Sequence, residues 1–98
     1  MELIIKKEGM ILMDDELLKK YGYVLSSSYR VRVMKALEYD IKTPTNIAKE
    51  ARITSNHISR VLGELKDADL AECLNEEEWK GRLYRLTEDG KEIMENLD

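Results

Sequence analysis

The segment from residue 43 to residue 65 constrains this chain more than any other, because it contains two helix starts only eleven residues apart. Thr43 can cap the first helix, and Pro44 can occupy its first helical position, where the missing N–H has no cost. Thr54 can cap the second helix, and Ile53 before it can pack on Ile58 as a hydrophobic staple. A turn of about three residues between two helices predicts a helix-turn-helix.

Apolar residues in this segment recur at helical spacing. The short first helix has an apolar face made of Ile47, Ala48 and Ala51. The second helix follows the i, i+3, i+4, i+7 pattern of one buried face, with Ile58, Val61, Leu62 and Leu65. Because these residues should point inward, we expect the polar residues between them to point outward.

A β-hairpin and one more helix are expected after the second helix, which should end near Ala68. Residues 70–74 and 82–86 are strand candidates on either side of the polar turn at residues 75–81. Thr87 can cap a last helix, whose apolar side contains Ile93, Met94 and Leu97.

Upstream of residue 43 the chain predicts an N-terminal arm and two helices. Two apolar runs within residues 1–13 are separated by a polar stretch with Gly9, which fits a small hairpin or an extended arm. Asp14 can cap a helix that ends at Gly22, and a run of serines can cap the next helix, residues 26–39. An apolar arm can pack on a second copy of the chain or cover the core of its own monomer, and both alternatives stay open.

The helix-turn-helix segment resembles the core of winged-helix transcription regulators, through the motif Thr-x-x-x-Ile-Ala-x-x-Ala-x-Ile-Thr-x-x-x-Ile-Ser-Arg-x-Leu-x-x-Leu at residues 43–65. The nearest groups are the arsenic-repressor-like (ArsR) and multiple-antibiotic-resistance-repressor-like (MarR) families, especially their small archaeal members. Residues 82–90 resemble the end of the wing, the β-hairpin of these proteins. The resemblance covers residues 28–96.

This resemblance implies an α+β, mainly helical fold, a winged helix-turn-helix with a two- to three-stranded β wing. Residues 1–22 do not resemble the winged-helix core, so they add an extra N-terminal segment. We expect residues 1–25 to form that extension, which is suited to dimerisation, and residues 26–98 to form the DNA-binding domain. Relatives often have glycine where this chain has Arg52, in the turn, and Asp69, after the second helix. An arginine at φ > 0 costs on the order of 1 kcal/mol, whereas aspartate is better tolerated there.

In such proteins the second helix, here about residues 54–68, lies in the major groove with its N-terminal residues against base edges. Arg60 can pair bidentately with guanine and Asn56 with adenine, and each pair is worth about 1–3 kcal/mol of discrimination. From composition alone, small polar residues at a helix start are explained as well by capping and solvated surface as by DNA contact, and His57 at the margin fits a surface role. The resemblance implies DNA contacts from Thr45, Arg52, Thr54, Ser55, Asn56, His57, Ser59, Arg60, Lys80 and Arg82.

The wing is unusual because residues 76–78 place three glutamates at or near its tip, where DNA-binding wings usually carry lysine or arginine. One interpretation is that the acids point away while Lys80 and Arg82 meet the phosphates. The other is that the wing contacts a protein instead. Trp79, the only tryptophan, can anchor such an interface or pack across the hairpin.

The net charge of −4 is distributed unevenly along the chain. Residues 28–70 carry eight basic and six acidic side chains, a net +2, whereas residues 71–98 carry four and nine, a net −5. Phosphate attraction depends on the charge of the binding face more than on the total. A surplus of two therefore predicts weak DNA binding at high salt unless the protein forms a dimer.

The remaining residues favour neither an enzyme, a cofactor nor a metal site. Cys73 is the only cysteine and His57 the only histidine, so we expect no metal site and no intramolecular disulfide. No glycine-rich phosphate loop and no acid–base set are recognisable. No apolar run reaches the roughly 18 residues of a membrane span, and no signal peptide is apparent, so we expect a cytoplasmic protein without a membrane partner.

Together these observations predict a sequence-specific, double-stranded DNA-binding transcription regulator that acts as a homodimer and is not an enzyme. An effector is not predicted. The alternative is a winged-helix module that binds a protein and has little DNA affinity, which the acidic wing and the acidic C-terminal part favour.

Overall fold

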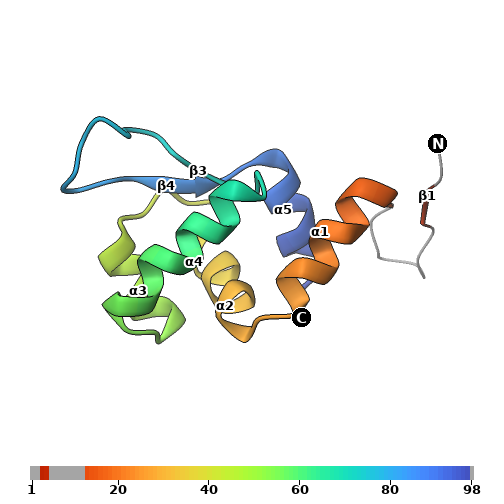
Figure 1. Cartoon of the computed structure of the whole chain (residues 1–98), viewed down its shortest axis with the longest axis horizontal. Coiled ribbons are helices and arrows are strands. Elements are labelled where there is room, and N and C mark those ends of the chain that lie inside the picture. Colours follow the sequence, from red (N-terminus) through yellow and green to blue (C-terminus); the bar gives the residue numbers. More distant parts are fainter. Residues whose placement is uncertain (1–2, 5–12, 98) are drawn as a thin grey trace.

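The computed structural model describes residues 3–4 and 13–97. In this part of the chain, helices surround one core, and a β-hairpin extends from one end of the molecule (Figure 1). The elements in chain order are β1 (Leu3–Ile4), β2 (Met13–Asp14), α1 (Asp15–Leu25), α2 (Ser28–Leu37), α3 (Pro44–Ala51), α4 (Ser55–Asp67), β3 (Ala71–Cys73), β4 (Tyr84–Leu86) and α5 (Glu88–Glu95).

The helix-turn-helix forms at the predicted residues, as α3 and α4. The Thr43 hydroxyl accepts a hydrogen bond from the Asn46 N–H at 3.3 Å, and Pro44 opens the helix. Thr54 occupies the cap position of α4, but its side chain makes no capping hydrogen bond. Arg52 adopts a left-handed conformation, with φ of 59°, so the turn has the geometry for which glycine is favoured.

The predicted apolar faces of both helices are buried in one core, together with residues from every other helix. Helix α2 packs against both helices. It ends at Leu37, two residues before the predicted end, because Glu38 adopts φ of 54°. The side chains that α3 and α4 bury are Ile47, Ala48, Ala51, Ile58, Val61, Leu62 and Leu65.

The wing is an antiparallel pair of short strands, with Ala71 opposite Leu86 and Cys73 opposite Tyr84. A third strand is reduced to one bridge, in which Lys42 and Tyr84 exchange two backbone hydrogen bonds of 3.0 and 2.9 Å. The mainly helical α+β winged helix-turn-helix that the sequence predicted is therefore confirmed.

Helix α1 is longer than predicted, and the expectation that Gly22 ends it was wrong. The helix continues to Leu25, because Val24 is fully buried in the core and the Ser26 N–H donates to the Gly22 carbonyl. Asp14 caps it as predicted, through a hydrogen bond of 2.8 Å from the Leu17 N–H.

The N-terminal arm is described only where β1 pairs with β2 in antiparallel register. The predicted turn at Gly9 and the second apolar run up to residue 12 lie outside the described residues. Met13 and Leu17 are buried with the rest of the core, so α1 packs on its own monomer. The dimer arm and the domain boundary at residue 25 stay predictions.

None of the helices in the described part of the chain has the length and apolarity that crossing a membrane requires.

We predict opposite effects from alanine at two glycines. A methyl group on Gly90 of α5 would collide with the backbone carbonyl oxygen of Leu70, so Gly90→Ala should destabilise the protein by about 1–3 kcal/mol. Gly22 lies inside α1 with no atom near its Cβ position, so Gly22→Ala should stabilise by about 0.5–1 kcal/mol. Urea unfolding of both variants measures the two changes, and a neutral Gly90→Ala would contradict this packing.

Candidate nucleic-acid interface

The outward face of α4 is polar, because its apolar positions are all buried against the core. Ser55, Asn56, Ser59 and Arg60 are exposed on this face, and His57 is half-buried at its margin. The structure thus brings together five of the predicted DNA-contacting residues on one helix, within its first two turns.

Arg60 is held by a neighbouring carboxylate one helical turn away. Its Nη1 donates to Oε2 of Glu64 at 2.8 Å, while Oε1 of Glu64 accepts from Nη1 of Arg30 at 2.9 Å. Arg30 is buried, with 9% of its surface exposed. Its other N–H groups donate to the Tyr23 carbonyl and to the Ser26 hydroxyl at 2.8–3.0 Å. A continuous network of ion pairs and hydrogen bonds therefore connects the exposed face of α4 to α2 and to the end of α1.

These contacts change the pKa of the Glu64 carboxyl group. Burial raises the pKa of Glu64, but the hydrogen bonds from Arg30 and Arg60 lower it by more, and the resulting pKa lies below the usual value of 4.5. Glu64 is therefore charged at neutral pH, and its negative charge attracts the guanidinium groups of both arginines.

The turn between α3 and α4 is fixed by a second arginine of α2. Arg32 donates from Nε to the carbonyl of Ala51 at 3.0 Å and from Nη2 to the carbonyl of Arg52 at 2.7 Å. Sequence reasoning missed both Arg30 and Arg32. A signal was present for Arg30, because it lies three residues before the buried Val33 and so on the inner stripe of α2.

His57 contacts an aromatic ring of α2. The ring centroids of His57 and Tyr29 are 5.1 Å apart and tilted by 52°, and the guanidinium of Arg32 lies 5.1 Å from the same Tyr29 ring.

Among residues 3–4 and 13–97, no three His, Cys, Asp or Glu side chains gather in a way that could hold a metal ion. Cys73 is half-buried on β3, with its thiol 3.6 Å from the Asn75 side-chain oxygen.

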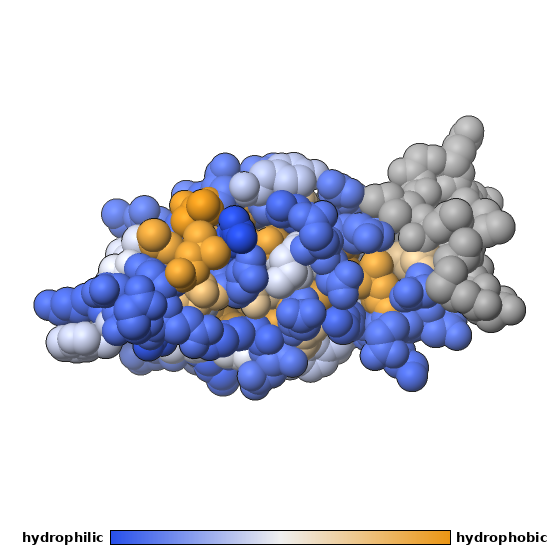
Figure 2. All heavy atoms as spheres, turned by 90° about the horizontal axis from the view of Figure 1, so that it is seen from above, coloured by the Kyte–Doolittle hydropathy of each residue, from blue (hydrophilic) through white to orange (hydrophobic). Residues whose placement is uncertain are grey.

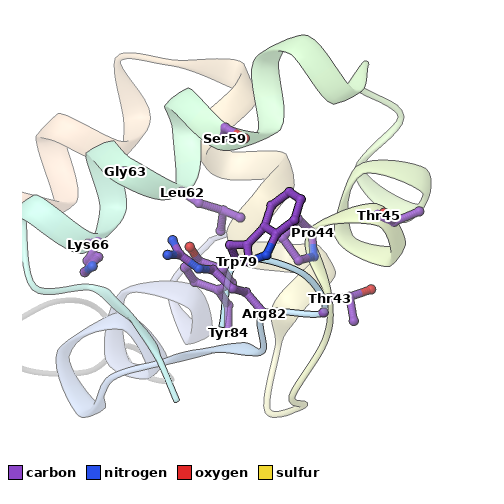
Figure 3. A pocket seen from close by; sticks show the side chains of 11 residues that line it. Thr43, Pro44, Thr45, Ser59, Leu62, Gly63, Lys66, Trp79, Arg82 and Tyr84 are labelled. Carbon is purple, nitrogen blue, oxygen red and sulfur yellow. The ribbon is translucent and has the colours of Figure 1, made fainter. Parts of the chain in front are cut away.

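A groove of about 570 Å³ separates α4 from the wing. Figure 3 shows Ser59 and Leu62 of α4 on one side, the start of α3 at one end, and Trp79 and Arg82 of the wing on the other side. The groove contains two further predicted DNA contacts, since Thr45 and Arg82 both line it. The full lining is Thr43, Pro44, Thr45, Ser59, Leu62, Gly63, Lys66, Trp79, Gly81, Arg82 and Tyr84.

Arg82 of the wing is engaged within the protein. Arg82 donates to the backbone carbonyls of Glu76, at 3.2 Å, and Glu78, so its guanidinium braces the wing loop. Glu76 turns back to α4, where it forms an ion pair of 2.8 Å with Lys66, and this hydrogen bond lowers the pKa of Glu76. Trp79 is 83% exposed, so it does not pack across the hairpin.

The other predicted contacts lie nearby but outside the outward face of α4. Arg52 and Thr54 are exposed in the turn that precedes α4, and Lys80 is exposed on the wing, 5.6 Å from the ring of Trp79. All ten residues therefore lie on the helix-turn-helix or on the wing.

The similarity of this chain to known proteins is found in their solved structures. No model of a protein family matches the chain, and no curated protein matches it. Among solved structures the chain is similar to NadR, in the crystal structure of NadR in complex with 4-hydroxyphenylacetate. The TM-score is 0.59 at 19% identity, over 83% of this chain and 62% of the NadR chain, so this chain spans less than two thirds of its neighbour. At this identity the likeness shows the fold alone, and the fold of this chain is a winged helix-turn-helix.

The lowered pKa of Glu64 predicts an acid-dependent loss of stability. A carboxylate whose pKa is lower in the folded than in the unfolded protein stabilises the fold above the unfolded value and ceases to do so as the pH falls through the folded value. Between neutral pH and about pH 3, the wild type should therefore lose more unfolding free energy than Glu64→Gln. Urea unfolding at the two pH values measures this difference, and equal losses in both proteins would contradict the ion-pair network.

Proposed function

We propose that this protein is a sequence-specific, double-stranded DNA-binding transcription regulator that places α4 in the major groove. The observation that carries the proposal is the exposed polar face of α4, on a helix-turn-helix whose turn and helix are braced by Arg30 and Arg32. A rigid helix that presents short polar side chains and one arginine has the chemistry that base edges require.

Two residues of this face can read bases directly. Arg60 can donate two N–H groups to the O6 and N7 acceptors of guanine, and Asn56 can pair with N6 and N7 of adenine. Ser55 and Ser59 are short donors that suit phosphates or bases. In this arrangement the side chains near the start of α4 specify sequence.

Phosphate contacts would come from the elements beside α4. Thr45 stands in the first turn of α3, and Arg82 lines the same groove, while Lys80 projects from the wing. Contacts of this kind fix register and make affinity fall steeply as salt rises.

We further propose that the regulator is a homodimer that works in the cytoplasm and has no catalytic role. One recognition helix offers few base contacts, whereas two helices about 34–36 Å apart read two half-sites of a palindrome. Helix α1 exposes Tyr23 and Leu25 beyond its buried face, which supports the proposed role of the N-terminal extension in dimerisation.

The first test is salt-dependent binding of a mixed-sequence duplex pool, followed by fluorescence anisotropy at about 50 mM and 200 mM salt. Binding of the pool should weaken steeply with salt. On a duplex selected from that pool, Arg60→Ala should weaken binding by about 5- to 150-fold, the value of one bidentate base contact. Sequence selection on the same pool should recover paired half-sites if the homodimer proposal is correct.

Arg85→Ala is the matched control for that test. Arg85 is as exposed as Arg60, at 47% against 51%, and is paired with Glu72 at 2.7 Å as Arg60 is with Glu64 at 2.8 Å. Because Arg85 does not line the groove beside α4, Arg85→Ala should change affinity by less than about twofold. Equal losses in both variants would show a general charge effect and would argue against base reading by α4.

A protein-binding module remains the second candidate, because the wing exposes apolar side chains. Trp79 is almost fully exposed, and Ile41 and Leu74 are half-exposed beside the wing strands. Figure 2, seen from above, shows a mostly hydrophilic surface with a compact apolar area close to the wing. Exposed aromatic and aliphatic residues of this kind are typical anchors of protein interfaces.

Intrinsic fluorescence of Trp79 distinguishes a wing that contacts DNA from one that does not. Trp79 is the only tryptophan and shares a groove with Ser59, so a duplex seated on α4 should cover it and change its emission. Emission should therefore shift in parallel with anisotropy as duplex is added. An unchanged emission during full binding would leave the wing free for a protein partner.

A further inference from the structure

The contact between Arg60 and Glu64 uses only part of the arginine. Nη1 of Arg60 donates to Glu64, and within the described residues the guanidinium has no other hydrogen-bond partner. A guanidinium has five N–H donors in a planar fork, so the edge formed by Nε and Nη2 remains for a bidentate partner. Arg60 can thus hold Glu64 and a base edge at the same time.

The position of Glu64 is fixed from its other side. Its second oxygen is bound by Arg30, which is itself buried and held by the Tyr23 carbonyl and the Ser26 hydroxyl. An exposed i, i+4 pair ordinarily has little stability and samples several geometries. Here one partner is anchored to the core, so the carboxylate stays where Arg60 meets it.

The negative charge of Glu64 affects the two kinds of DNA group differently. A phosphate that approaches Arg60 also approaches Glu64, and like charges repel. The edge of guanine is neutral and accepts hydrogen bonds from an arginine that keeps its carboxylate partner. Glu64 therefore weakens a sequence-independent contact of Arg60 more than it weakens a guanine contact.

We infer that Glu64, anchored by Arg30, is a positioning and specificity-determining residue for Arg60. It orients the guanidinium toward a guanine edge and reduces its attraction to phosphates of any sequence. This inference rests on the proposed DNA-binding function. It assigns to Arg30, which touches no DNA in this arrangement, a role in sequence discrimination that acts through Glu64.

The test compares Glu64→Gln with Glu72→Gln, each in the wild type and in Arg60→Ala. Both substitutions remove one carboxylate that is paired with an arginine at 2.7–2.8 Å, but Glu72 lies on the wing sheet and is paired with Arg85. The probe is a duplex library with a randomised core, used for anisotropy at about 50 mM salt and for sequence selection.

Glu64→Gln should raise affinity for the unselected library by about two- to fivefold, the range of one exposed ion pair, and Glu72→Gln should not. Sequences selected by Glu64→Gln should lose preference for guanine at the position that Arg60→Ala also affects. In the Arg60→Ala background, Glu64→Gln and Glu72→Gln should select the same sequences, because the residue that Glu64 positions is gone.

The possible failures are distinguishable. If the wild type shows no salt-sensitive binding to the library, the proposed function and this inference both fail. If the wild type binds but Glu64→Gln matches Glu72→Gln in affinity and in selected sequences, only the inference is overturned, and Glu64 is a structural ion-pair partner. Far-UV circular dichroism checks the fold of each variant, and a variant that unfolds is remade in the stabilised Gly22→Ala background.

Discussion

The buried guanidinium of Arg30 is the interaction on which the arrangement of the helices depends. A charge taken out of water is tolerated only when its polar atoms are paired, and each nitrogen of the Arg30 guanidinium has a partner, from two other segments. The Tyr23 carbonyl belongs to the last turn of α1, where carbonyls have no partner in the helix, so Arg30 also completes the end of that helix. Because its remaining partner is Glu64, the end of α1 and the orientation of α4 are set together.

The parts of this fold that the sequence could predict are those determined by neighbouring residues. The caps at Thr43 and Thr87 follow from local hydrogen bonding, and the buried face of α4 follows from its spacing. The prediction at Gly22 was wrong because a glycine does not end a helix when burial of the following residues stabilises the continued helix. Here burial of Val24 stabilises α1 by more than the glycine destabilises it. Of the candidate site, the outward residues of α4 were predictable, whereas the roles of Arg30 and Arg32 depend on partners 19 to 34 residues away.

Charge counting along the chain overestimates how positive the candidate interface is. The eight cations of residues 28–70 include Arg60, whose partner Glu64 is already counted among the six acids, and Lys66, whose partner is not. The carboxylate partner of Lys66 is Glu76, from the acidic wing, so an acid that looked unfavourable for DNA binding neutralises a cation of α4 instead. A face on which two cations of α4 are already paired attracts phosphates less, and discrimination between sequences must then come from geometry more than from net charge.

The groove between α4 and the wing links the two candidate functions physically. Ser59 and Lys66 of α4 and Trp79 of the wing line one space, and the bridge between Lys42 and Tyr84 ties the wing strands to the residue before Thr43, at the start of α3. A duplex seated on α4 and a protein seated on Trp79 would both need this space. Binding of one would therefore weaken binding of the other, and by linkage the effect would be equal in both directions. A protein partner of the wing would in that case act as a regulator of DNA binding and not as an independent function.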